Sequence, residues 1–354
     1  MPQNNQHRTI RTNRVRAIDL FCGAGGSSWG AQAAGVKIVA AFDMWPMAES
    51  VYRDNFPDVR FYSGRIEDHN INRIVQEVGK IDLIIASPEC TNHSVARGNK
   101  PRCEKSRETA LLVVNFARAF KPRWVVVENV VSMKKWSRYA EFIREMKDLG
   151  YHCIARTLNA ADFGVPQARR RLFLMFDLER EPHWTKPPRR KRKTAGQIMN
   201  GNGKYSYTPL RSERRAKATL ERADRAIAHV GERTPFLMVY YGSDHAEGWQ
   251  SLDAPLRTIT TLDRFALVKP CDGGHVMRML QPEELKAAMG WPHRFKIERG
   301  TRREKIKLIG NAVCPPVVEA IVKHLLADCQ CCCDLCGVWD RRGCERHLLG
   351  GEEG

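Results

Sequence analysis

The stretch IDLFCGAGG, residues 18–26, joins an apolar strand pattern to a glycine-rich turn. A helical pattern over residues 27–34 follows the turn directly. Glycines let a backbone approach a ligand closely, and the start of a helix offers free N–H groups. The spacing G-x-G-G is not the dinucleotide pattern G-x-G-x-x-G, which disfavours a nicotinamide oxidoreductase. A tight turn alone can give the same glycines, but Asp43 ends the next strand and suits ribose hydroxyls, so we expect a nucleoside ligand.

Short apolar strands alternate with helical patterns from residue 15 to 177, which predicts an α/β fold with a doubly wound, mostly parallel sheet. Further strands are expected at 38–42, 81–86, 124–127, 152–158 and 172–176, and further helices at 46–55, 106–120 and 138–149. From about 183 to 275 the periodicity weakens, which indicates a second, smaller and irregular domain. Helical patterns return between 280 and 327, and we expect the last helix to pack on the first domain.

Composition points to a protein that binds nucleic acid. The chain has 354 residues, 12 cysteines and a net charge of +18, with basic clusters at 183–194 and 211–225. A solvated surface is the alternative, but the clustering disfavours it. No apolar run reaches the roughly 18 residues of a membrane helix, and the first residues lack an apolar signal segment. We therefore expect a cytoplasmic protein with reduced cysteines and no membrane partner.

Cys90 lies just beyond the strand at 81–86, in the run SPECTNHS. A thiol on a loop at the end of a strand is where an α/β enzyme places a nucleophile. Four more motifs follow in order: VVVENV with Glu128, VPQARRRLFLMF with Arg169 and Arg171, LRTITT, and LIGNAV with Asn311. Taken alone, Cys90 fits a buried structural thiol, and the arginines fit a solvated strand face.

This ordered set resembles the DNA (cytosine-5)-methyltransferase family of bacteria and phages, over about residues 15–327. The resemblance implies a Rossmann-like methyltransferase fold that binds S-adenosylmethionine. It implies a catalytic, cofactor-binding domain at 13–182 completed by 305–328, a target-recognition domain at 183–304 that binds duplex DNA, and a tail at 329–354. The implied cofactor-binding residues are Phe21, Gly23, Gly25, Asp43, Met44 and Asn311.

By resemblance, Cys90 adds as a thiolate to carbon-6 of cytosine, which makes carbon-5 nucleophilic. Glu128 holds a proton at ring nitrogen 3, Arg171 contacts the base carbonyl, and Arg169 positions the loop or a phosphate. Methyltransferases of this kind rotate the target base out of the duplex. The basic segment 94–103 resembles the family's mobile lid over DNA, with a plain surface loop as the alternative.

Three positions depart from the family pattern. Glu89 stands between Pro88 and the nucleophile, where a carboxylate raises the pKa of a thiol unless it points away. Arg65 replaces the usual aspartate that accepts the adenine amine, and Asp68 or a backbone carbonyl is left as the acceptor. Met44 stands where an aromatic residue usually stacks on adenine.

The tail holds Cys333, Cys336, Cys344 and His347, a spacing with zinc-knuckle character. A structural zinc is one reading, and a cysteine-rich extension is the other.

Two other functions stay open. An RNA cytosine methyltransferase shares the motif order, although the long basic recognition segment favours DNA. A non-catalytic DNA-binding protein on the same fold is disfavoured by the complete set of Cys90, Glu128, Arg169 and Arg171. We expect a monomer, with a cognate restriction endonuclease as a further partner. The sequence gives neither the recognised bases nor the base that removes the carbon-5 proton.

Overall fold

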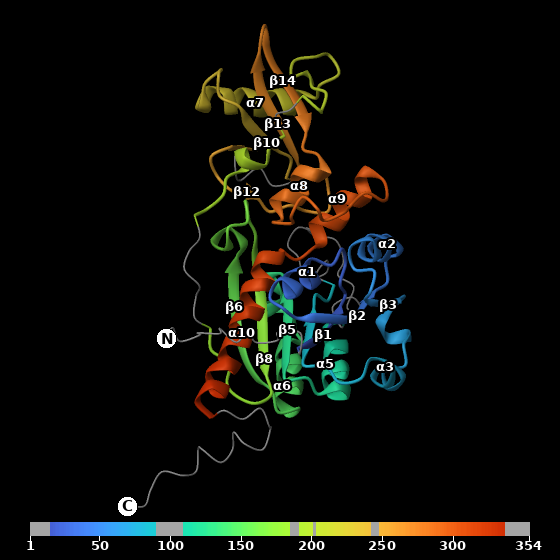
Figure 1. The fold of residues 1–354 in the computed structure, drawn as a ribbon. Helices are drawn as coiled ribbons and strands as arrows, with labels where there is room; N and C mark the ends of the chain where they lie inside the picture. Colours follow the sequence, from blue (N-terminus) through green and yellow to red (C-terminus); the bar gives the residue numbers. More distant parts are fainter. Residues whose placement is uncertain (1–14, 90–108, 185–190, 201–202, 242–247, 337–354) are drawn as a thin grey trace, which may run out of the picture.

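The apolar runs of the first half of the chain form one central sheet (Figure 1). The computed structural model describes residues 15–89, 109–184, 191–200, 203–241 and 248–336. The sheet has seven strands, in the order β3 (Arg60–Ser63), β2 (Lys37–Asp43), β1 (Arg16–Leu20), β4 (Leu83–Ala86), β5 (Trp124–Asn129), β8 (Arg170–Asp177) and β6 (His152–Asn159). Only β8 in this sheet runs antiparallel to its neighbours, β5 and β6. The expected mostly parallel, doubly wound sheet is therefore confirmed.

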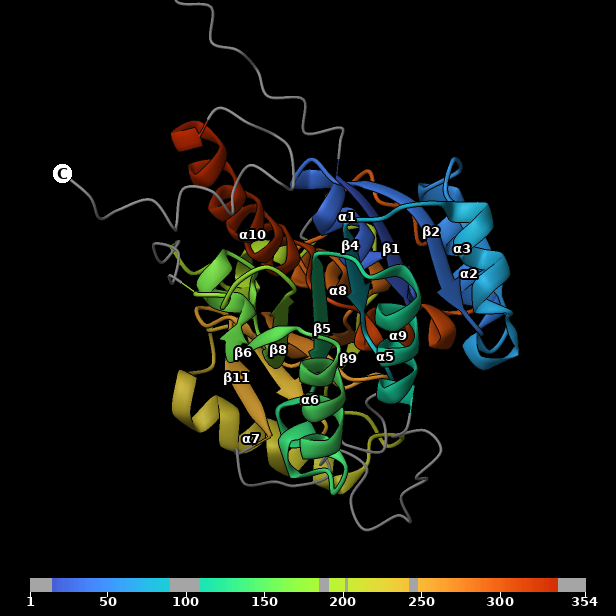
Figure 2. The same ribbon diagram turned by 90° about the horizontal axis from the view of Figure 1, so that it is seen from below.

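Helices cover both faces of this sheet because its strands are apolar on both sides. In β1, Ala17 packs into one apolar cluster, and Ile18 packs into the other. The first cluster includes α1 (Gly26–Ala33), α2 (Pro46–Asn55) and α10 (Pro315–Cys336); the second includes α3 (Ile71–Val78), α5 (Thr109–Phe120) and α6 (Tyr139–Asp148). Figure 2 shows α1 and α10 on one side of β4 and β5, and α5 and α6 on the other.

The helix α10 crosses α1 at short range. A Cβ atom on Gly30 would lie 2.4 Å from the carbonyl oxygen of Pro315, so only glycine permits this approach. The C-terminal helix therefore packs on the first lobe, as the sequence predicts. It continues to Cys336, beyond the helical pattern that ended at 327.

The second lobe is more regular than the sequence pattern indicated. A five-stranded antiparallel sheet has the order β11 (Trp249–Ser251), β10 (Phe236–Val239), β13 (Phe265–Cys271), β14 (Gly274–Met279) and β9 (Thr208–Pro209). The helix α7 (Lys217–Val230) contributes Ala223 and Ala226 to a small core of its own with Phe236 and Met238. Strands of two to seven residues with charged neighbours give too little periodicity to recognise in the sequence.

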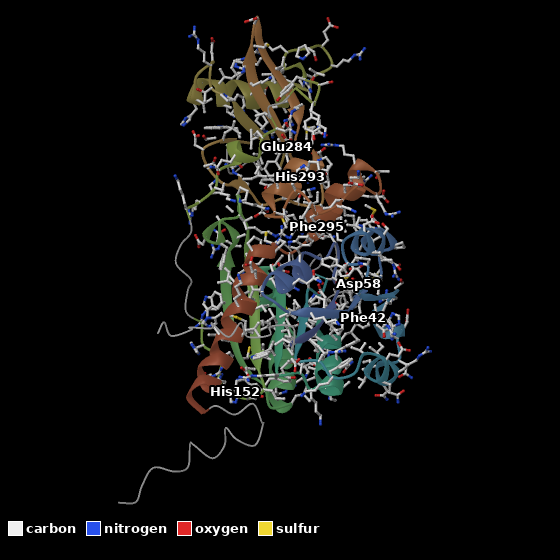
Figure 3. All side chains as sticks on the ribbon, viewed as in Figure 1. Phe42, Asp58, His152, Glu284, His293 and Phe295 are labelled. Atoms are coloured by element: carbon white, nitrogen blue, oxygen red, sulfur yellow. The ribbon has the colours of Figure 1, made fainter. Side chains whose placement is uncertain are left out.

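The junction between the lobes contains a two-stranded parallel sheet, β7 (Gln167–Ala168) with β12 (Leu256–Arg257). The helices α8 (Pro282–Ala288) and α9 (Arg302–Asn311) also lie between the lobes (Figure 1). Glu284 of α8 accepts two hydrogen bonds from Arg278 of β14, at 2.6 and 2.7 Å, and both side chains are buried. Phe295 packs at 5.2 Å from the ring of Trp29 in α1, and Figure 3 shows it below Glu284. Part of segment 183–304 thus contacts the first lobe, and the boundary at 304 stays a prediction.

Four 3-10 turns complete the described secondary structure: η2 (Ile66–Asp68), η4 (Val131–Lys135), η5 (Ala160–Phe163) and η6 (Ala195–Ile198). Among the described residues, no helix combines the length and apolarity that a membrane span requires.

Candidate active site

The segment that leads to Cys90 is fastened to the end of β5. The side-chain amide of Asn129 donates to the carbonyl oxygen of Pro88 at 3.1 Å, and the Asn129 side chain is buried. Cys90 itself and the segment 94–103 lie outside the described residues. The described chain nonetheless brings the exit from β4 beside Glu128, which precedes Asn129.

Glu128 and Arg171 form an ion pair at this edge of the sheet. The Nε atom of Arg171 lies 3.3 Å from Oε1 of Glu128, and the two side chains are 16% and 10% exposed. Burial raises the pKa of Glu128, and the positive charges of Arg171 and Arg169 only partly offset the increase. The acid is thus biased toward the protonated form, as a group that holds a proton on a substrate requires.

Arg169 lies deeper than Arg171 and bonds to backbone. Its guanidinium donates to the carbonyl oxygens of Ile259, Gly310 and Ala312, each at 3.0 Å, and the residue is 3% exposed. These three carbonyls belong to the RTITT segment and to the GNAV motif. Arg169 therefore joins segments that are 90 to 143 positions away in the sequence.

Gln167, which the sequence interpretation did not include among its site residues, performs a similar role. Its side-chain amide donates to Ala288 of α8 at 3.2 Å and accepts from the N–H of Ile259 at 2.9 Å. Thr258 also donates to the carbonyl of Ala168 at 2.9 Å. The Gln-x-Arg-x-Arg motif pointed to Gln167 as a candidate site residue, but the spacing of the motif does not indicate which of its side chains are buried.

A small cavity, about 10 Å³ in volume, lies beside the acid. Its lining includes Glu128, Arg169, Arg171, Val313 and Cys314, and it has room for about one water molecule. Its lining therefore combines residues from three sequence motifs: Glu128 from VVVENV, Arg169 and Arg171 from VPQARRRLFLMF, and Val313 from LIGNAV.

Three cysteines near the core are held as neutral thiols. Burial raises the pKa of Cys314 to about 11 and that of Cys153 to about 12. Burial, with the nearby carboxylates Asp43 and Asp19, also raises the pKa of Cys22 well above its usual value. A thiol must be deprotonated to act as a nucleophile, so none of these three is suited to that role.

The glycine turn after β1 has the shape of a ligand cradle. Phe21, Gly23 and Gly25 have φ angles of 58°, 53° and 87°, a region that side chains seldom adopt. A Cβ atom on Gly23 would meet nothing within 4 Å, so the turn is open on that side. A Cβ on Gly25 would lie 2.4 Å from the Phe56 ring, so this glycine is needed for packing.

Asp43 closes one side of the cradle. Its two carboxylate oxygens accept from the N–H groups of Gly23 at 2.8 Å and Trp45 at 2.9 Å. Each oxygen keeps further acceptor capacity for a ligand hydroxyl. Met44 follows with a side chain that is 63% exposed, and it therefore offers an apolar surface beside the turn.

Asp19 lies beneath the turn. Its Oδ2 accepts from the hydroxyls of Ser27 and Ser28, while its buried Oδ1 has no hydrogen-bond partner. Burial raises the pKa of Asp19 to about 7, against the lowering effect of the two serines. A buried carboxylate oxygen without a partner fits a site for a ligand that carries positive charge.

Asn311 ends α9 and is exposed between Gly310 and Ala312, whose carbonyls Arg169 holds. The carbonyl of Val313 lies so close to Gly26 that a Cβ there would be 2.2 Å away. The fold thus brings the GNAV motif to the glycine turn. Asn311 lies two residues before the Val313 carbonyl that approaches this turn, and its role in cofactor binding stays a prediction.

Arg65 is exposed and pairs with Glu67, whose Oε1 accepts from its Nε at 2.8 Å. Glu67 is a carboxylate close to Arg65 that the sequence interpretation did not consider. Asp68 is exposed in η2.

For the tail, Cys333 and Cys336 fall within the span of α10, while Cys344 and His347 lie outside the described residues. Within the described part of the chain, no group of three or more histidine, cysteine, aspartate or glutamate residues could hold a metal ion. The zinc site stays a prediction.

Comparison with known proteins identifies the family. The family model for C-5 cytosine-specific DNA methylase matches residues 15–327. The chain belongs to this family. M1.HphI of Haemophilus parahaemolyticus, a type II methyltransferase, is 26% identical over 328 residues, which cover 87% of this chain and 86% of that protein.

M.HindV of Haemophilus influenzae is 32% identical over 175 residues, and M.AgeI of Thalassovita gelatinovora is 31% identical over 167. The chain spans 56% and 39% of the lengths of these two type II methyltransferases. Among solved structures, DNMT2 of Spodoptera frugiperda has a TM-score of 0.66 at 16% identity, covering 88% of this chain and 99% of that one. A putative DNA modification methyltransferase encoded in an Escherichia coli prophage has a TM-score of 0.64 at 19% identity, with the same two coverages. The likeness to these structures supports the methyltransferase fold.

Proposed function

We propose that this protein transfers a methyl group from S-adenosylmethionine to carbon-5 of cytosine in duplex DNA, through a covalent bond between Cys90 and the base. The observation that carries this proposal is the buried Glu128–Arg171 pair at the end of β5, beside the fastened exit of β4. A nucleophile that leaves β4 would meet the acid and the arginine on the same edge of the sheet.

In the proposed reaction the Cys90 thiolate adds to carbon-6 of the ring, and the ring electrons move toward carbon-5. Glu128 provides the proton at ring nitrogen 3 that balances the developing charge, and its raised pKa suits this role. Arg171 contacts the base carbonyl and stays paired with Glu128. After methyl transfer, a base removes the carbon-5 proton, the thiolate leaves, and the proton on ring nitrogen 3 returns to Glu128, which restores the ring, Cys90 and the acid.

Arg169 acts in this proposal as a positioning residue. It holds the RTITT segment and the GNAV motif against the wall that carries Glu128. A shift of these segments would displace the acid from the base, and catalysis is sensitive to such displacements.

The glycine turn fits S-adenosylmethionine, which supplies the methyl group when it is bound. Asp43 would accept hydrogen bonds from the ribose hydroxyls, and Met44 would cover the adenine ring. The part of the site that holds the methionine moiety of the ligand would be lined by Phe21, Gly23, Gly25 and Asn311. The unpartnered oxygen of Asp19 beneath the turn suits the positive charge of this ligand.

Duplex DNA is the substrate that the second lobe favours. The chain carries a net charge of +18, and the run before the second sheet is basic. Within this run, Arg192 bonds to Asp162 of the first lobe at 2.9 Å, which fixes one end of it. Since several relatives are named type II methyltransferases, we propose that the protein works alone as a monomer and protects sites from a cognate restriction endonuclease.

Bisulfite sequencing of DNA from cells that express the protein tests this function. The expected result is methylated cytosine in one sequence context, absent with Cys90→Ser because a hydroxyl is a far weaker nucleophile than a thiolate. DNA that contains 5-fluorocytosine should trap a crosslink at Cys90 and not at Cys22. Methylation at the parent rate in Cys90→Ser would refute the proposed mechanism, and methylation confined to RNA would refute the substrate.

A further inference from the structure

Tyr240 and Tyr241 follow β10 directly and pack on opposite sides of the chain, as successive residues of an extended segment do. Tyr240 packs into the small core of the second lobe, where the guanidinium of Arg222 in α7 lies 5.3 Å from its ring centroid. Its hydroxyl bonds to Thr219 of the same helix. Tyr241 packs instead against the large core that the two lobes share, and its ring lies 6.0 Å from that of Phe265. Tyr241 is therefore the member of the pair that lies against the junction of the lobes.

The Tyr241 hydroxyl begins a chain of hydrogen bonds that leads to the candidate active site. It donates to the carbonyl oxygen of Thr258 at 2.6 Å, and the Thr258 hydroxyl donates to the carbonyl oxygen of Ala168 at 2.9 Å. Ala168 directly precedes Arg169, which lines the cavity beside Glu128. Two hydrogen bonds thus connect the end of β10 in the second lobe with the backbone next to Arg169.

The phenol of Tyr241 is suited to act as a permanent donor. Burial raises the pKa of Tyr241 to about 12, and the positive charges of Arg257, Arg264 and Arg169 only partly offset this increase. The hydroxyl therefore keeps its proton near neutral pH and can donate to Thr258. At 2.6 Å, the bond is at the short end of the range for a hydroxyl donor. This bond is a fixed link between the two segments that it joins.

We propose that Tyr241 is a positioning residue for methyl transfer, because its hydroxyl holds Thr258 and, through Thr258, the segment that carries Arg169. The inference rests on the proposed function, in which the second lobe binds DNA and Arg169 positions the active site. DNA that fits the second lobe would favour the arrangement of this segment that the reaction requires. Small displacements of such a segment are enough to slow catalysis.

The test begins with Tyr241→Phe, which removes the hydroxyl and keeps the ring, once the recognised DNA sequence has been mapped. The single-turnover rate of methyl transfer should fall by roughly tenfold, the effect expected when one hydrogen bond of the reacting arrangement is lost. The Kd for DNA and the Kd for S-adenosylmethionine should each stay within about twofold of the parent values, because neither ligand loses a contact. A merely structural role would not lower the rate selectively in this way.

A double-mutant cycle tests whether Tyr241 acts through Thr258. Thr258→Val, which removes the second hydroxyl and keeps the shape of the side chain, should slow methyl transfer to the same extent. The double variant should be no more than about twofold slower than either single variant, because both changes break one chain of bonds. Tyr240→Phe is the matched control, since it removes the neighbouring hydroxyl that bonds to α7. Its single-turnover rate should equal that of the parent protein.

The inference is overturned if Tyr241→Phe keeps the parent rate, or if it acts only by weakening DNA binding. It is also overturned if Tyr240→Phe slows methyl transfer as much, or if the effects of Tyr241→Phe and Thr258→Val multiply. In each of these cases the parent protein would still methylate cytosine, whereas failure of the proposed function would leave no methylation by the parent protein. Circular dichroism of each variant verifies that the fold is intact.

Discussion

Replacing Arg169 with methionine separates a structural role from direct contact with the substrate. The guanidinium is 3% exposed and donates to three backbone carbonyls at 3.0 Å. Methionine keeps the apolar stem but removes all three bonds. The carbonyls of Ile259, Gly310 and Ala312 would then be left without this donor in the interior.

A hydrogen bond from a charged donor contributes about 1.5–3 kcal/mol, and a buried acceptor that loses its donor costs about 1–3 kcal/mol. Two of the three bonds come from the same nitrogen atom, so their contributions do not simply add. We therefore expect Arg169→Met to lower the free energy of unfolding by about 3–5 kcal/mol. Arg170→Met is the control, because Arg170 is exposed, and it should change that free energy by less than about 0.5 kcal/mol.

Urea unfolding followed by circular dichroism measures both values, and methyl transfer to DNA is measured beside it. Arg169→Met could abolish turnover yet lower the free energy of unfolding by less than about 1 kcal/mol. That result would refute the interpretation that Arg169 acts by holding the two segments through its backbone hydrogen bonds. Arg169 would then act on the substrate or on a phosphate instead.

Further predictions concern chemistry, pH and DNA. Glu128→Gln should lower turnover by more than roughly tenfold, about 1.4 kcal/mol, with little change in S-adenosylmethionine affinity; a smaller loss in single-turnover assays would make Glu128 a positioning residue. Burial raises the pKa of Asp19 to about 7 from 3.8, so its contribution to stability is complete below about pH 4 and is lost as the pH rises through about 7. Asp19→Asn should therefore gain stability relative to the parent protein as urea unfolding is repeated from about pH 4 to about pH 8; equal pH slopes would contradict this. Neutralising the basic run 189–193 should weaken binding alike on all DNA sequences and flatten its salt dependence, which fluorescence anisotropy at several salt concentrations would show; an unchanged slope argues against phosphate contacts. Exchanging segment 205–255 with that of a relative should change which cytosines bisulfite sequencing reports, and an unchanged pattern would place specificity elsewhere.

The sequence alone determined the central strands and the motifs at their ends. A strand that is buried on both faces must be apolar throughout, so β4 and β5 stand out as continuous runs such as LIIA and WVVVEN. Glycines with positive φ are required by local geometry, so the turn at Gly23 and Gly25 was also readable. These features depend on neighbours in the chain. The same is true of Glu128, which ends a recognisable strand.

Edge elements were not predictable in this way. The strand β3 is four residues long, RFYS, and half of its side chains are exposed, so its pattern resembles a loop. The sheet of the second lobe was hidden for the same reason, because its strands are short and its core is small.

Only the tertiary structure decided what the residues around the acid do. Arg169 and Arg171 stand two positions apart in one motif, yet one clamps three distant carbonyls and the other pairs with Glu128. The difference arises because the chain passes from β7 to β8 between them, so each guanidinium meets partners from other parts of the fold. The turn at residues 260–263 is held in the same way, since Gly310 of α9 approaches the carbonyl of Thr260 and Arg302 of α9 donates to Asp263 at 2.7 Å. Contacts between residues far apart in the chain exist only after the lobes have packed, and no local pattern encodes them.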